Sequence, residues 1–282
     1  MTGITLQQVI TNVRDLPSLP LIVTELISTF GQDDVSVGEL GAQVSKDQAL
    51  TAKTLRLANS SFYGLQCKVR TIDQAIAVLG FDSVRALVTS AGIIGNFSRL
   101  DGGAFDFAAF WRHAIGTALC AKSLARLAKC NQEFAFVSGL LHDIGRLVLV
   151  TGFPEQYGDV IAHGVANDCD MLDAERAVLR LDHAVVGRAL AEHWKFPAPI
   201  QRAIGNHHAP APADLGDIPS VVHVADAIVH ALDLAGLPDE RVPTIAQDAW
   251  DSLRIDSAGL RRVLVDTEAE FENACQILTA TT

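Results

Sequence analysis

The sequence predicts an all-α protein, and three observations support this fold class. Apolar residues recur at the three- and four-residue spacing of one helix face along most of the 282 residues. We find no convincing segment that alternates apolar and polar residues as a half-buried strand would. Several of the 10 prolines stand where helices would begin or end, among them Pro154, Pro197 and Pro219. We find no internal repeat and no low-complexity tail.

Residues 1–100 form the first predicted unit, a bundle of short amphipathic helices. Four apolar groups mark its helices in chain order: Leu21, Val23, Leu26 and Ile27; Val37, Leu40 and Val44; Leu50, Thr54, Leu55 and Leu57; Ile72, Ala75, Ile76 and Leu79. Ser36 is a candidate N-cap for the second of these helices. Gly80 ends the fourth, and a fifth begins near Val84. The pair Gly102-Gly103 separates this unit from the next.

Residues 105–232 form the second predicted unit, on which the bundle is expected to pack. Its helices are longer and more apolar than those of the first unit. Residues 134–150 are apolar on nearly every side, which predicts a central helix enclosed by its neighbours, and residues 219–232 are similar. Residues 233–282 are more charged and predict a C-terminal extension of two or three packing helices.

Composition and charge indicate a cytoplasmic protein. There are 22 Lys and Arg against 33 Asp and Glu, so the formal net charge is −11, which disfavours non-specific binding to nucleic acid or anionic membranes. No uninterrupted apolar run approaches the roughly 18 residues of a membrane span. The first residues lack the basic and then apolar pattern of a secretory signal. The 5 cysteines form no CxxC pair, which favours reduced thiols.

Three polar residues, His142, Asp143 and Arg146, interrupt the apolar run FAFVSGLLHDIGRLVLV. A buried ionised carboxylate is costly unless it is paired or bound to a metal. Other segments carry matching groups: His113, His183, His207, His208 and Asp226. Gly116 and Cys120, on the same face as His113, indicate space for a bound group. Imidazoles and carboxylates that converge on one cavity favour one or two ions of Fe, Mn, Zn or Ni over Ca or Mg.

Each of these residues also has an ordinary structural interpretation. A buried His is often bonded to a main-chain carbonyl. Asp143 and Arg146, at i and i+3, would form an ion pair on a helix. Asp226 with His223 and His230 would form a solvated stripe. The ordered set as a whole is harder to explain in this way, and a shared aspartate between two ions would suit phosphoester cleavage.

The order of these residues resembles the HD superfamily of metal-dependent phosphohydrolases, whose signature is a His, an HD dyad, further His residues and a late Asp. The resemblance implies that the metal ligands are His113, His142, Asp143, His183, His207, His208 and Asp226. HDIGR and the His-His pair are similar to the branch that contains cyclic dinucleotide phosphodiesterases. In that branch a Lys takes the place of Arg146, which would here contact a phosphate.

Two departures from that branch bear on its activity. The segment APAPAD after His208 lacks the GYP-type sequence that would build a substrate loop, and Ala109 stands where some relatives have a Glu ligand. These differences leave metal binding in place as an expectation. They argue against substrate turnover.

Three blocks of the first unit resemble the HDOD domain: LPSLPLIVTEL, VSVGELGAQVSKDQALTAKTLRLANSSFYG and TIDQAIAVLGFDSVRALV. The resemblance extends from about Val13 to Asp226. It implies an output or regulatory module of bacterial signal transduction that acts on a signalling protein partner. It also implies a module without the fused receiver domain that many members carry.

Three functional hypotheses follow. The first is the regulatory HDOD module, which binds metal without turnover, because no Walker, GxSxG or dinucleotide-binding glycine motif is present. The alternative is a metal-dependent phosphohydrolase or cyclic dinucleotide phosphodiesterase with a nucleotide ligand. The third is a helix-turn-helix DNA binder over residues 36–63, with Lys46, Lys53 and Arg56 on its second helix, although the acidic charge makes nucleic acid the least expected partner.

Overall fold

The computed structural model describes residues 4–13, 19–30, 37–60, 63, 65–97, 105–236 and 241–279. These residues form helices and turns, with no strand among them, which confirms the predicted all-α class. The predicted N-cap Ser36 and the predicted break at Gly102-Gly103 lie outside the described residues.

The helices follow one another with short connections. The first six are α1 (Leu6–Val13), α2 (Leu21–Ser28), α3 (Val37–Val44), α4 (Gln48–Ala58), α5 (Ile72–Leu79) and α6 (Phe81–Phe97). The next are α7 (Phe107–Ala128), α8 (Gln132–Leu141), α9 (Ile144–Gly152), α10 (Pro154–Asn167), α11 (Met171–Leu179), α12 (His183–His193), α13 (Ala198–Asn206), the 3₁₀ turn η2 (Pro212–Asp214) and α14 (Ile218–Ala231). The last are α15 (Gln247–Leu253) and α16 (Ser257–Thr279).

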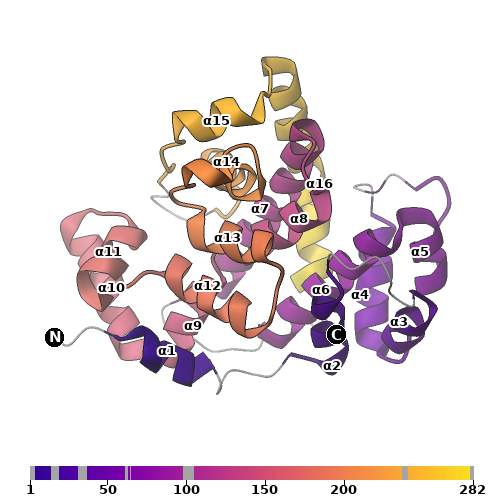
Figure 1. Ribbon diagram of the computed structural model, residues 1–282, viewed down its shortest axis with the longest axis horizontal. Coiled ribbons are helices and arrows are strands. Elements are labelled where there is room, and N and C mark those ends of the chain that lie inside the picture. The colour runs from indigo at the N-terminus through magenta and orange to yellow at the C-terminus, as the bar shows by residue number, and fades with distance from the viewer. Residues whose placement is uncertain are drawn as a thin grey trace.

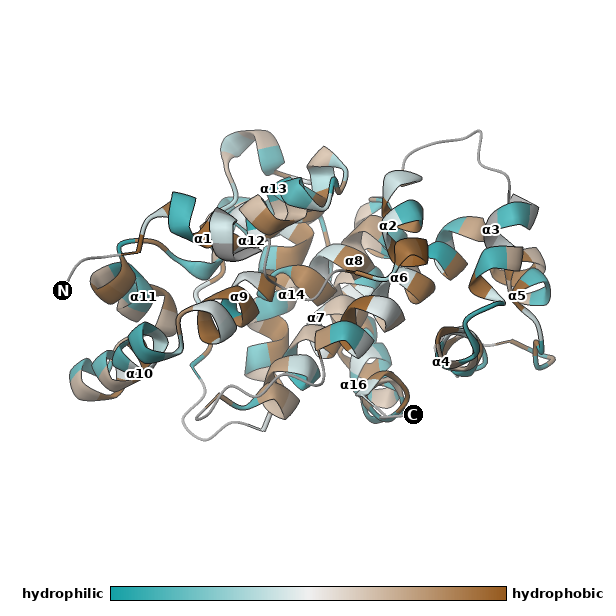
Figure 2. Ribbon diagram, turned by 90° about the horizontal axis from the view of Figure 1, so that it is seen from below, coloured by the Kyte–Doolittle hydropathy of each residue, from teal (hydrophilic) through white to brown (hydrophobic). Residues whose placement is uncertain are grey.

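The long helix α7 is the centre of the packing. It pairs with α8 on one side and contacts α14 and α16 on others, while α16 also reaches α4 and α6 (Figure 1). Figure 2 shows that apolar residues predominate in central helices such as α8 and α14, and that hydrophilic residues colour much of α10 and α11 at one end. The C-terminal helices therefore join the two predicted units instead of forming a separate layer.

Helix α1 lies apart from the other N-terminal helices. It packs on α9 and α12, and the main-chain N–H of Ile4 donates to the carbonyl oxygen of Leu179 at 3.0 Å. Figure 1 shows α1 at the opposite end of the molecule from α3, α4 and α5. In space, the first helix of the chain accompanies the second predicted unit.

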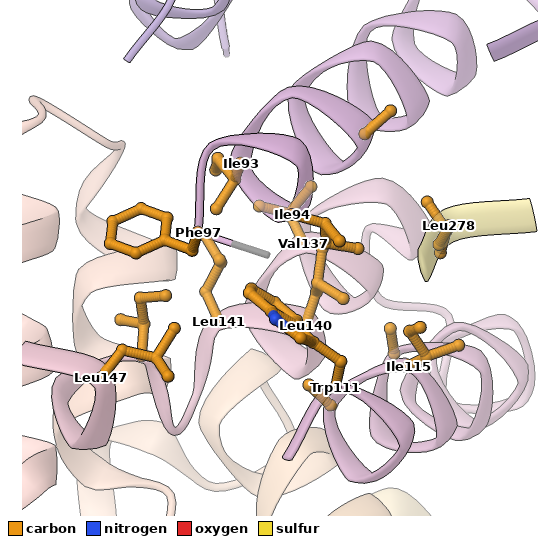
Figure 3. Close-up of a cluster of buried hydrophobic side chains, with 14 of the residues drawn as sticks. Ile93, Ile94, Phe97, Trp111, Ile115, Val137, Leu140, Leu141, Leu147 and Leu278 are labelled. Carbon is orange, nitrogen blue, oxygen red and sulfur yellow. The ribbon is translucent and has the colours of Figure 1, made fainter. Parts of the chain in front are cut away.

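One apolar core connects the two units. Figure 3 shows side chains of α6, α7, α8, α9 and α16 gathered in it, and the labelled members are Ile93, Ile94, Phe97, Trp111, Ile115, Val137, Leu140, Leu141, Leu147 and Leu278. All ten are at most 3% exposed. Because α6 contributes to the same core as α7 and α8, removal of the N-terminal helices would expose apolar surface of the second unit.

The predicted single helix over residues 134–150 is wrong in one respect, because the chain turns between α8 and α9. His142 follows the last residue of α8, and Asp143 precedes the first residue of α9. The His142 ring contacts the carbonyl oxygen of Gly139 through Nδ1 at 2.8 Å, a local side-chain bond at the end of α8. The stretch Gln132–Gly152 is long and apolar enough to cross a membrane, but 83% of its most apolar window is buried within the protein, as in a core helix.

The helix-turn-helix outline is present, but its basic surface is incomplete. Helices α3 and α4 are separated by three residues, as the pattern predicts. Lys53, however, is only 7% exposed, and its Nζ donates to the carbonyl oxygen of Leu278 in α16 at 3.5 Å. Lys53 therefore serves the contact between α4 and α16, and Lys46 and Arg56 are left exposed.

Candidate metal centre

The structure brings all seven predicted side chains into one cluster. His113 comes from α7, His142 and Asp143 from the turn between α8 and α9, and His183 from the first residue of α12. His207 and His208 follow α13, and Asp226 comes from α14. Their ligand atoms fall into groups in which every pair lies within 4.8 Å.

The first group surrounds the carboxylate of Asp226, and we call it group A. Asp226 Oδ1 lies 3.0 Å from His113 Nε2, 3.5 Å from His142 Nε2 and 3.3 Å from His230 Nε2. The Nε2 atoms of His113 and His142 are 3.1 Å apart. Three imidazoles thus point one nitrogen each at the same carboxylate oxygen.

The second group surrounds the carboxylate of Asp143, and we call it group B. Asp143 Oδ1 lies 3.1 Å from His183 Nε2 and 3.6 Å from His207 Nε2, and the Nε2 atoms of His183 and His208 are 2.7 Å apart. The same Asp143 oxygen is 3.7 Å from His142 Nε2 of group A. Asp143 is therefore the residue that the two groups share.

This arrangement fits divalent transition-metal ions. Two N or O ligands held about 2.0–2.2 Å from one ion lie roughly 3.0–3.6 Å from each other. The distances in the cluster, from 2.7 to 3.7 Å, bracket that range. His207 Nε2 is buried in the cluster and makes no hydrogen bond. Imidazole and carboxylate donors in this proportion suit Fe, Mn, Zn or Ni.

The imidazole rings are oriented by contacts at their other nitrogens. His142 Nδ1 lies 2.8 Å from the carbonyl oxygen of Gly139, and His207 Nδ1 lies 2.8 Å from that of Ile204. Because a carbonyl only accepts, each Nδ1 carries the proton and leaves Nε2 as the acceptor that faces the cluster. Main-chain carbonyls thus do orient these rings, as the ordinary interpretation expected, and they do so with the ligand nitrogen pointing inward.

The electrostatics of the cluster keep both carboxylates ionised. Burial raises the pKa of Asp143, but His142 and His183 outweigh it and hold this pKa well below its usual range. Burial also raises the pKa of Asp226, and its bonds to neighbouring imidazoles likewise hold it low. Burial lowers the pKa of His113, so that this imidazole stays neutral and able to ligate.

Comparison with known proteins identifies the family. Residues 16–210 match the HDOD domain, which is about two thirds of the chain. The chain belongs to the HDOD family. A solved structure from Shewanella amazonensis, described as a candidate phosphohydrolase, is 30% identical to this HDOD protein, with a TM-score of 0.78 over 96% of this chain and 98% of that one.

Two further relatives agree with this placement. A solved HDOD domain protein of unknown function from Geobacter sulfurreducens is 23% identical, with a TM-score of 0.78 over 97% of this chain and 98% of that one. An uncharacterised protein of Treponema pallidum is 26% identical over 265 residues, which make up 92% of this chain and 50% of the relative. This HDOD chain therefore spans about half the length of that curated relative.

Glu175 in α11 is a functional residue that the sequence did not reveal. In this HDOD protein it is completely buried, and its Oε2 accepts from the main-chain N–H of His183 at 2.8 Å and contacts His183 Nδ1 at 2.6 Å. Burial lowers the pKa of His183, but the carboxylates of Glu175 and Asp143 outweigh it and raise this pKa to about 10. Glu175 lies in a charged segment, LDAERA, that gives no sign of burial.

Arg146 is engaged within the protein. Its Nη1 donates to Asp143 Oδ2 at 3.1 Å and its Nε to the Tyr157 hydroxyl at 3.4 Å, while the guanidinium lies over the Phe105 ring at 5.8 Å. The Tyr157 hydroxyl in turn donates to Glu175 Oε1 at 3.3 Å. The ion pair expected from the i and i+3 spacing is present, and it belongs to a network that runs from Asp143 round to Glu175.

Two further interpretations from the sequence need correction. Asp226 and His223 do not form a solvated stripe, because they are 3% and 4% exposed, and His223 is bonded to the main chain of His207 and Ala246. Gly116 leaves no space for a bound group beside His113. A Cβ atom on Gly116 would lie 3.0 Å from Val229 Cγ1 and 3.3 Å from both Leu234 and Phe271 side-chain atoms, so neighbouring segments fill that space.

Proposed function

We propose that this chain is a regulatory HDOD module that binds one or two divalent transition-metal ions and acts through a signalling protein partner, without substrate turnover. The observation that carries the proposal is the position of Asp143 Oδ1 between two groups of buried imidazoles. A buried carboxylate shared in this way is a natural ligand for one ion or a bridge between two.

The two groups divide the ligands between them. Group A would hold one ion through His113, His142 and Asp226, and group B a second through His183, His207 and His208, with Asp143 available to both. An ion bound there would act as a Lewis acid toward a coordinated oxygen. The residues themselves tie α7, the α8–α9 turn, α12, α13 and α14 to one point, so ion binding would favour this arrangement of the helices over others.

Burial of the cluster supports binding without turnover. The side chains of His142, Asp143 and His207 are 1%, 7% and 0% exposed, so a phosphodiester has no access to them unless the helices move. Arg146, the residue expected to contact phosphate, donates instead to Asp143 and Tyr157. The regulatory role then rests on how ion binding changes the surface that a protein partner contacts.

The decisive test of this proposal is the metal content of protein purified without added metal. We expect one or two equivalents in the wild-type protein and loss of metal in His142→Ala and Asp143→Ala. The exposed His193, outside the cluster, provides the matched control, and His193→Ala should retain its metal. A wild-type protein that stays metal-free even after incubation with Mn, Fe, Zn and Ni would refute the proposal.

A metal-dependent phosphohydrolase remains the second candidate, because a shared aspartate also suits a two-ion hydrolytic site. The similar Shewanella amazonensis structure carries a phosphohydrolase description, which favours the same assignment. The test is incubation of the metal-loaded protein with mono-, di- and cyclic nucleotides. Turnover that disappears in His142→Ala would establish the enzyme, and absence of turnover with every nucleotide would favour the regulatory module.

We place this activity in the bacterial cytoplasm. All five cysteines are free thiols in the structure, including the exposed Cys67, as a reducing compartment would maintain them. The acidic charge and the burial of Lys53 disfavour the DNA-binding hypothesis. Binding to duplex DNA with a steep salt dependence would revive it.

A further inference from the structure

We propose that His230 is a direct ligand of the ion in group A, a role that the family resemblance does not assign to it. This inference rests on the proposed metal binding and extends it to an eighth side chain. It concerns the one imidazole of the cluster that lies outside the predicted set.

The geometry of His230 matches that of the predicted ligands. His230 Nε2 lies 3.3 Å from Asp226 Oδ1, between the 3.0 Å of His113 and the 3.5 Å of His142. Its ring centroid is 4.3 Å from that of His113. His113, Asp226 and His230 form a group whose ligand atoms all lie within 4.8 Å of one another.

Helix periodicity and close packing direct His230 to this point. Asp226 and His230 are at i and i+4 on α14, so both side chains lie on the helix face that meets α7. Gly116 of α7 lets Val229 approach, because a Cβ atom there would lie 3.0 Å from Val229 Cγ1. Arg112 of α7 donates to the carbonyl oxygen of Leu234 at 3.1 Å and fixes the chain just after α14.

With His230 included, the two groups have matching composition. Group A then holds three imidazoles, from His113, His142 and His230, around Asp226. Group B holds three imidazoles, from His183, His207 and His208, around Asp143. The two ions would therefore be of similar chemical type. The His230 side chain is 22% exposed, compared with 4% for Asp226, so His230 is on the solvent side of group A.

A cobalt titration of the full chain tests this inference. Metal-free wild-type protein, His230→Gln and the exposed control His193→Gln are titrated with Co²⁺ in competition with a chelator. We expect the Kd of one ion to rise by about tenfold or more in His230→Gln, because loss of a ligand costs at least as much as loss of an outer-shell partner. The second ion and the His193→Gln control should keep their wild-type affinity. Equal melting temperatures of the metal-free proteins would show that folding is unchanged.

A cysteine substitution separates direct ligation from mere orientation of Asp226. His230→Cys should restore binding and produce a thiolate-to-cobalt charge-transfer band that wild-type protein and His193→Cys lack. Weaker binding in His230→Gln without that band in His230→Cys would overturn the inference and leave His230 as a positioning residue. Unchanged cobalt affinity in His230→Gln would overturn it alone, whereas a wild-type protein that binds no ion would refute the proposed function as well.

Discussion

Gly145 and His183 are in direct main-chain contact. A Cβ atom on Gly145 would lie 2.0 Å from the carbonyl oxygen of His183 and 2.6 Å from the main-chain nitrogen of Gly187. Helices α9 and α12 therefore meet backbone to backbone just after Asp143 and His183, whose ligand atoms are 3.1 Å apart. The glycine of HDIGR is thus required for this close approach, which brings the two ligands of group B together.

Gly145→Ala should separate α9 from α12 and disrupt group B. The added methyl group meets main-chain atoms that cannot move independently, so we expect a loss of about 3 kcal/mol or more in unfolding free energy. Urea denaturation of the metal-free protein measures it. Gly158 of α10 has open space at its Cβ position, and Gly158→Ala should instead stabilise the protein by about 0.5–1 kcal/mol. Equal stability of the two variants would contradict the packing argument.

Glu175→Gln should weaken metal binding at group B without removing a ligand. Glu175 fixes His183 through both the main-chain N–H and Nδ1, and a carboxylate in this position makes the imidazole a better donor. We expect the Kd of one ion to rise about 10- to 100-fold, as measured by chelator competition. The exposed Glu192 pairs with Arg188 on the neighbouring helix, and Glu192→Gln should bind both ions normally. An effect of equal size in that control would refute the role given to Glu175.

Lys122 and Glu133 form a buried ion pair at the junction of the two predicted units. Lys122 Nζ lies 3.1 Å from both Glu133 Oε1 and the Tyr63 hydroxyl, and Ser83 donates to Glu133 at 2.9 Å. Glu133→Gln should cost about 3 kcal/mol of unfolding free energy, because it leaves the Lys122 charge buried without its carboxylate.

The second substitution Lys122→Met should restore most of the loss caused by Glu133→Gln, because it removes the stranded charge. Urea denaturation of the two single variants and the double variant measures the coupling. The exposed pair Arg126–Asp266 is the control, and Asp266→Asn should change stability by less than about 1 kcal/mol. Strict additivity of Lys122→Met and Glu133→Gln would show that the buried pair is not coupled.

Metal loading should raise the melting temperature of the wild-type protein. At a free ion concentration of about 100 times Kd, binding adds about 2.7 kcal/mol, which corresponds to a shift on the order of 5 °C for a chain of this size. Removal of the ion by a chelator should reverse the shift. Asp143→Asn should show almost none, because Asp143 is the residue that both groups share. A shift of equal size in Asp143→Asn would place the ion elsewhere.

Most of the candidate centre could be predicted because its residues violate the burial pattern of their own helices. His142 and Asp143 interrupt an apolar run, and an unpaired charge there is costly, so a partner or an ion had to be expected. Glu175 and His230 gave no such signal. Glu175 lies in a charged segment, and His230, one turn after Asp226, was read as part of a solvated stripe. Their roles depend on which helices face them.

The sequence by itself determined the helical class, the family and the seven residues that meet at one point, because helical periodicity and polar residues in apolar runs are local properties of the chain. The tertiary structure alone decided the turn between α8 and α9, the packing of α1 against α9 and α12, and the burial of Lys53 against α16. Each of these depends on contacts between segments far apart in the chain, where main-chain approach and side-chain packing outweigh local preference.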